Sequence, residues 1–110
     1  MVQISWTKLA ISDLQEIHDY IARDSKTFAK LQIVRIRSQT RILKSQPAIG
    51  RIVSEIDQAD IRELIQGSYR IIYKIISKER IDIITIHHSS RNLQGIKMEK
   101  WIGPRVRKLT

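Results

Sequence analysis

Arginine and histidine side chains stand at positions along this chain where a plain hydrophobic core would not need them. The candidate site residues are Arg62, Arg70, His88 and Arg91. A guanidinium can hold an anionic group through two parallel N–H donors, and an unperturbed imidazole exchanges a proton around pH 6.5. These residue types suit the binding of an anionic partner, or acid–base chemistry on one.

Three strand-like segments position these residues. They are Ile61 to Ile65, Tyr69 to Ile76 and Ile81 to His87, separated by short polar turns. The pattern predicts an antiparallel meander. Because side chains alternate between the two faces of a strand, we expect Tyr69 and Tyr73 on one face of the sheet and Arg70 on the other. By the same rule, His87 and His88 point to opposite faces, so they are not expected to form one site.

The first half of the chain predicts a strand and two helices. Residues 2–6 form a strand candidate, and Thr7 can cap a helix from about Lys8 to Arg23 with apolar residues at a helical spacing. Ser25 can cap a second helix from Lys26 to about Ser45, which ends before Pro47. The short turn between them predicts an antiparallel helical hairpin, and residues 51–56 form a further strand candidate.

Composition limits the class of protein. The chain has 110 residues, which fits one compact domain, and it has no cysteine, which excludes disulfides and thiolate metal sites. We find no metal-ligand spacing and no phosphate-binding glycine loop, so no metal and no cofactor are expected. No signal-peptide pattern and no apolar run of membrane-spanning length occur, which predicts a cytoplasmic protein with no membrane partner.

The charge balance is strongly basic. Twenty Lys and Arg against eleven Asp and Glu give a formal net charge of +9 and a pI near 10.3. Such an excess indicates an anionic partner, or serves only to keep the protein soluble. Residues 94–110 hold five Lys and Arg against one Glu and have a weak pattern, so we divide the chain into a domain at 1–93 and a basic C-terminal extension at 94–110.

The order of elements and three short motifs resemble the RelE/ParE superfamily of bacterial toxins. The motifs are Ile61-Arg62-Glu63-Leu64, Tyr69-Arg70-Ile71-Ile72-Tyr73 and His88-Ser89-Ser90-Arg91-Asn92-Leu93, preceded by Trp6, Asp13-Leu14, Pro47 and Gly50-Arg51. The resemblance covers residues 2 to 93. It implies an α+β fold in which a strand and a two-helix antiparallel hairpin pack on a small, mainly antiparallel sheet, followed by the C-terminal extension.

The resemblance also implies a function. It identifies a toxin of a type II toxin–antitoxin system, which a cognate antitoxin neutralises by forming a hetero-oligomer with it. RelE-like members cut messenger RNA in the ribosomal A site, whereas ParE-like members act on DNA gyrase. The expected partners are therefore an antitoxin and either gyrase or the ribosome with messenger RNA.

Each branch of the superfamily gives the candidate residues of this chain a different role. In a RelE-like ribonuclease, Arg70 and Arg91 would stabilise phosphate charge, His88 would exchange a proton, and Glu55 is a possible general base. The alternative for Arg70 is an ion pair with Glu63 or Glu55 across the sheet. For His88 it is a structural or binding role.

Two parts of the ribonuclease set are missing. The lysines that RelE-like ribonucleases place before the tyrosine-arginine motif are absent, with Ile61 and Glu63 in that neighbourhood, and so is the aromatic acid–base residue after the last strand. This favours a ParE-like, non-enzymatic gyrase inhibitor that contacts its target through the four candidate residues. The alternatives are a metal-independent, ribosome-dependent endoribonuclease and a non-toxic, basic nucleic-acid-binding member of the family.

Overall fold

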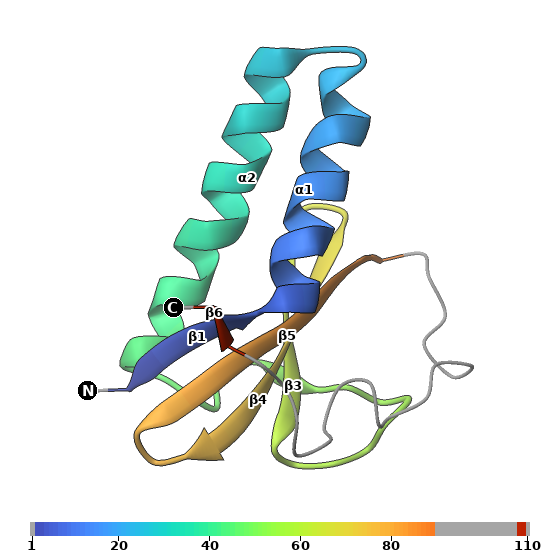
Figure 1. The fold of residues 1–110 in the computed structure, drawn as a ribbon. Helices are drawn as coiled ribbons and strands as arrows, with labels where there is room; N and C mark the ends of the chain where they lie inside the picture. The colour runs from blue at the N-terminus through green and yellow to red at the C-terminus, as the bar shows by residue number, and fades with distance from the viewer. Residues whose placement is uncertain (1, 90–107, 110) are drawn as a thin grey trace.

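The fold is a helical hairpin packed on one face of a mainly antiparallel sheet (Figure 1). The computed structural model describes residues 2–89 and 108–109. Its elements are β1 (Gln3–Thr7), α1 (Lys8–Ala22), α2 (Lys26–Thr40), a 3-10 helix η1 (Arg41–Lys44), β2 (Arg51–Ile52), β3 (Ile61–Gln66), β4 (Tyr69–Ser77), β5 (Arg80–His88) and β6 (Lys108–Leu109). This confirms the α+β class and the antiparallel hairpin expected from the sequence.

The strands form one sheet in the order β2-β3-β4-β5-β1-β6. Strands β3, β4 and β5 make the predicted meander, and β1 adds to β5 in parallel. The pairing of β1 with β5 ends at Trp6 and Ile83, although β5 continues to His88. The last residues of β5 therefore run beyond β1, beside helix α1.

Two expected elements are shorter in the structure. Helix α2 ends at Thr40, whose hydroxyl donates to the carbonyl of Arg37, and the chain continues as the 3-10 helix η1 instead of an α-helix to Ser45. The strand candidate at 51–56 was wrong beyond Ile52. There the carbonyl of Val53 accepts from the amides of Ile56 and Asp57, so the chain turns.

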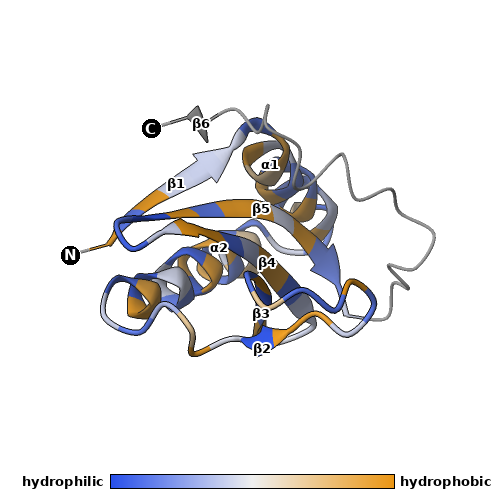
Figure 2. Cartoon of the chain, turned by 90° about the horizontal axis from the view of Figure 1, so that it is seen from below, coloured by the Kyte–Doolittle hydropathy of each residue, from blue (hydrophilic) through white to orange (hydrophobic). Residues whose placement is uncertain are grey.

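Residue alternation divides the core into two apolar layers. Ile71 and Tyr73 lie in the larger layer beneath the helices, with Tyr69 packed against it, whereas Ile72 lies in a smaller layer on the far face. This confirms the expected faces of β4. In Figure 2, β5 is hydrophobic through its middle and hydrophilic at its end, where His87 and His88 lie.

Polar side chains attach helix α1 to the sheet. The Thr7 hydroxyl accepts from the amide of Ala10, which caps α1, and donates to the carbonyl of Ile84 at 2.7 Å. Asp13 accepts from the amide of Ile86 at 2.9 Å, on the stretch of β5 beyond β1. Within the described part of the chain, no helix has the length and apolar character needed to cross a membrane.

Candidate functional site

Arg70 lies at the centre of a carboxylate network on the face of the sheet away from the helices. Its Nε donates to Glu63 Oε1 at 2.5 Å, from the neighbouring strand β3. Its Nη1 and Nη2 donate to the two oxygens of Glu55 at 2.8 and 3.0 Å, from the loop after β2. Each guanidinium nitrogen is thus engaged by a carboxylate. Of the two interpretations of Arg70 left open by the sequence, the ion pair is the one the structure contains.

The network is mostly buried. The side chains of Arg70 and Glu63 are 8% and 3% exposed, and that of Glu55 is 15% exposed. The hydrogen bonds that Arg70 donates to Glu55 raise its pKa most, and the bond that it donates to Glu63 adds to this effect. Charges buried this deeply require partners, because an unpaired charge in a low-dielectric interior is costly. Arg70 therefore serves as the buried ion-pair partner of two carboxylates that belong to the fold.

Arg51 is the cation of this cluster that faces solvent. Its Nε donates to Glu63 Oε2 at 2.8 Å, while 69% of its side chain is exposed. A cleft of about 300 Å³ opens here, lined by Arg51, Arg70, both glutamates and Ser89, among others. The two arginines and two glutamates cancel in formal charge. The cleft is not a free cationic pocket.

Arg62 is occupied by backbone carbonyl groups. Its Nη1 donates to the carbonyl oxygens of Gly50 and Ala48 at 2.9 and 3.3 Å, and its Nε donates to Ala59 at 3.0 Å. These contacts hold the segments before β2 and before β3 together. The geometry gives Arg62 a role in shaping the loops around the cleft.

His88 does not share a surface with Arg70. Arg70 is the cross-strand neighbour of His87, whereas His88 is the neighbour of Tyr69 and meets its ring edge-on, with 5.6 Å between centroids. Because Tyr69 lies toward the helices and Arg70 away from them, the sheet separates His88 from the guanidinium. A single phosphate cannot touch both groups in this arrangement. Arg91 lies outside the described residues, so its expected role stays a prediction.

The sequence matches a known family over most of its length. The family described as "ParE toxin of type II toxin-antitoxin system, parDE" matches residues 4–93. The chain belongs to the ParE toxin family. It is therefore the toxin component of a type II toxin–antitoxin system, and membership of that family implies a cognate antitoxin as partner.

Two individual proteins resemble this ParE-family toxin. The curated protein "Toxin RelE2" of Caulobacter vibrioides is 30% identical over 91 residues, covering 83% of this chain and 99% of that protein. The solved structure "Chromosomal ParDE TA system from P. aeruginosa" superposes with a TM-score of 0.66 at 21% identity, covering 80% of this chain and 96% of that one. The second likeness concerns the fold.

Sequence reasoning missed two features of this ParE-family toxin. Arg51 was recognised only as part of the Gly50-Arg51 motif, although a solvent-facing arginine opposite Glu63 is what the cleft presents. Asp13 was likewise named only as part of the Asp13-Leu14 motif, yet its carboxylate binds the edge of β5. The signal that could have revealed it is the spacing of three and four residues between Asp13, Glu16 and Tyr20, which places them on one stripe of the helix.

Proposed function

We propose that this toxin inhibits DNA gyrase without catalysing a reaction, and that its antitoxin neutralises it in the cytoplasm. The observation that carries the proposal is the pairing of Arg70 with Glu55 and Glu63. This arginine occupies the position that RelE-like ribonucleases use to stabilise phosphate charge. In this chain the guanidinium is paired with two carboxylates instead of a phosphate, which supports the ParE-like branch.

Electrostatics argues against a phosphate at Arg70. A phosphate would have to displace Glu55 from a bidentate ion pair, and it would then lie beside two carboxylates. Displacing one partner of a part-buried pair leaves a charge without compensation. His88 lies on the opposite face of the sheet, so it cannot donate a proton to a group bound at Arg70. Glu55 is engaged by Arg70 and is not placed as a free general base.

We further propose that exposed cations around the cleft contact the target. Arg51 is the candidate at the cleft, and Arg91, which lies outside the described residues, is a second candidate on the sequence alone. Arg62 and Arg70 would support this surface from beneath through the carbonyl and carboxylate contacts described above. His88 would belong to a separate surface on the helical side.

Supercoiling of relaxed plasmid by purified gyrase, with increasing toxin, tests the proposal. We expect inhibition that Arg51→Glu weakens and that Arg35→Glu, an exposed arginine on α2, leaves unchanged. Normal supercoiling at excess toxin would contradict the proposal. Codon-positioned cuts in messenger RNA would establish the ribonuclease alternative instead. Growth unaffected by the toxin alone, together with duplex DNA binding, would support the non-toxic nucleic-acid-binding alternative.

A further inference from the structure

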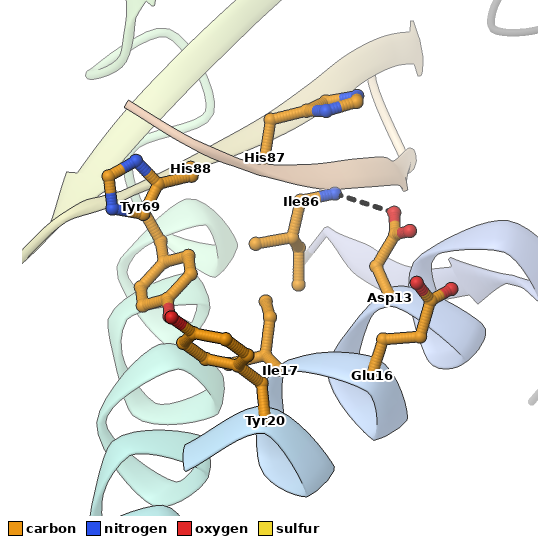
Figure 3. Close-up of a pocket in the computed structure, with 8 residues that line it drawn as sticks. All are labelled: Asp13, Glu16, Ile17, Tyr20, Tyr69, Ile86, His87 and His88. Atoms are coloured by element: carbon orange, nitrogen blue, oxygen red, sulfur yellow. Dashed lines mark hydrogen bonds between the residues drawn. The ribbon is translucent and has the colours of Figure 1, made fainter. Parts of the chain in front are cut away.

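A second hollow lies on the helical side of the sheet, where α1 passes the ends of β4 and β5 (Figure 3). Its volume is about 420 Å³. The residues that line it are Asp13, Glu16, Ile17, Tyr20, Tyr69, Ile86, His87 and His88. It shares no lining residue with the Arg70 cleft. Both His87 and His88 line it, so the expectation that the two histidines would not share a site was wrong.

The walls of this hollow differ in chemistry from one end to the other. Asp13 and Glu16 stand at one end, Ile17 and Ile86 form the middle, and the phenol groups of Tyr20 and Tyr69 meet at the other end (Figure 3). Carboxylates, apolar carbon and aromatic rings are the three surfaces that a guanidinium on an aliphatic stem can use together. The order of the walls suits a long cationic side chain.

Helix α1 and strand β5 hold the acidic end in place. Asp13 accepts from the amide of Ile86 at 2.9 Å and from the hydroxyl of Thr85, so its carboxylate is anchored. Glu16 lies one turn further along the same stripe, is exposed, and has no hydrogen bond or ion pair within the described part of the chain. In a protein of net charge +9, this is a local negative site that attracts cations.

The aromatic end already attracts a guanidinium. The Arg23 guanidinium carbon lies 5.7 Å from the centroid of the Tyr20 ring, which is within cation–π distance. Burial, and then the neighbouring phenol of Tyr20, raise the pKa of Tyr69 above its usual range. A tyrosine phenol is neutral near pH 7, and the ring of Tyr69 is a suitable surface for a cation.

We propose that this hollow binds an arginine side chain of the cognate antitoxin, with the guanidinium paired to Glu16 beside Asp13 and the stem lying against Ile17, Ile86 and the tyrosine rings. Arginine fits better than lysine, because its planar group is weakly hydrated, stacks on aromatic rings and pairs with a carboxylate through two donors. The proposal rests on the proposed function only in that the antitoxin is the partner. The net charge of +9 leads us to expect a partly acidic antitoxin, and the proposal adds a cationic anchor to it.

A titration of the full-length toxin with N-acetyl-arginine amide, followed by amide NMR shifts, tests the chemistry of the hollow. We expect saturable shifts at Glu16, Tyr20, Tyr69 and Ile86, and a weaker response to the neutral isostere N-acetyl-citrulline amide. Glu16→Gln should weaken binding about three- to tenfold. The matched control is Asp19→Asn, an exposed carboxylate on α1 that does not line the hollow and should change nothing. Equal responses to both probes, or no saturable shift, would overturn the proposal.

A double-mutant cycle in the toxin–antitoxin complex tests the identity of the occupant. Each antitoxin arginine is replaced by alanine in combination with Glu16→Gln, and dissociation constants are measured for all four members of the cycle. We expect one arginine to couple with Glu16 by about tenfold. Absence of coupling for every arginine would overturn the assignment to the antitoxin. Both measurements are independent of gyrase inhibition, so a failure of the proposed function would be distinguishable from a failure here.

Discussion

Arg70 stabilises the folded chain by forming ion pairs with Glu63 and Glu55. Glu63 is 3% exposed and therefore depends on protein partners for its charge. A side chain with this role complicates any functional test of Arg70, because its removal affects folding as well as chemistry. Loss of toxicity in an Arg70 variant is informative only when its stability is measured beside it.

Replacing Arg70 with methionine is expected to lower the free energy of unfolding by about 3 to 5 kcal/mol, because two carboxylates lose their buried partner. Denaturant unfolding followed by circular dichroism gives the value. Arg51→Met is the matched control. Its side chain is 69% exposed, and its loss should cost about 0 to 1 kcal/mol. If both substitutions lowered the free energy of unfolding equally, burial would not be the reason that Arg70 stabilises the fold.

Tyr73 joins the core to the segment before β2. Its hydroxyl donates to the carbonyl of Pro47 at 2.8 Å and accepts from the amide of Gly50 at 3.0 Å, and the residue is fully buried. Tyr73→Phe should destabilise the fold by about 1 to 3 kcal/mol, because a buried amide loses its acceptor. Tyr20→Phe, on a side chain that is 67% exposed, should have little effect on thermal unfolding. A wild-type melting temperature for Tyr73→Phe would contradict this role.

Alkaline pH should weaken the fold through the same phenol. Burial raises the pKa of Tyr73, so the unfolded chain loses the proton around pH 10 while the folded chain keeps it. The contribution of Tyr73 to the free energy of unfolding is then constant below about pH 10 and decreases as pH rises above it. Denaturant unfolding at several alkaline pH values measures this slope. The slope should be shallower in Tyr73→Phe, with Tyr69, whose pKa is also raised, accounting for part of what remains.

At the scale of elements, the loop from Pro47 to Asp60 determines what the sheet presents on its far face. It supplies Glu55 to Arg70 and carries β2, which pairs with β3 for only two residues. Arg62 and Tyr73 hold this loop through backbone groups. The cleft at Arg51 exists because a loop with little regular structure is attached at these points.

At Gly50 the loop lies close against the sheet. A Cβ atom there would lie 2.6 Å from both the carbonyl oxygen of Glu63 and the hydroxyl of Tyr73. Gly50→Ala is therefore expected to displace the loop and to lower stability by about 1 to 3 kcal/mol. Thermal unfolding is the measurement. Gly67→Asn is the control, since Gly67 has φ +59, a conformation that asparagine tolerates, and a Cβ there meets only Gln32 at 3.6 Å. Similar losses for both variants would contradict the steric argument.

At the scale of the whole molecule, charge is distributed unevenly. The net charge is +9, yet the cleft around Arg70 is balanced and the hollow beside α1 is acidic. A long-range field of this sign speeds encounter with anionic partners, while local sites select the contacts. The long-range field acts mainly on the association rate and the local contacts act mainly on the dissociation rate, so binding kinetics can distinguish them.

Raising ionic strength should slow association with a partly acidic antitoxin and change its dissociation much less. Screening reduces the long-range attraction over a Debye length of about 8 to 10 Å near physiological salt, whereas packed contacts are affected little. Surface plasmon resonance at two salt concentrations measures both rates. An association rate independent of salt would show that the positive charge serves solubility and not partner capture.

Local signals in the sequence were enough to predict most of the helices and strands of this protein. Thr7 and Ser25 cap the helices, the turn at residues 66–68 sets the hairpin of β3 and β4, and alternation placed Tyr73 and Arg70 on opposite faces. These features depend on residues a few positions apart, so short-range rules describe them. The end of α2 and the turn after Ile52 differed from the expected bounds. At Thr40 a hydroxyl group bonds the carbonyl of Arg37, and after Ile52 backbone amides bond the carbonyl of Val53, and such bonds compete with a weak periodicity.

Only the tertiary structure shows which groups the site residues pair with and which face of the sheet each one occupies. Arg70 was a candidate for phosphate or for carboxylate, and only the loop that brings Glu55 across 15 positions to Arg70 selects the second. His88 and Arg70 seemed part of one site in the chain, yet the cross-strand register sets them on opposite faces. Side-chain partners separated by loops depend on the packing of the whole chain, and no local pattern of residues encodes that packing.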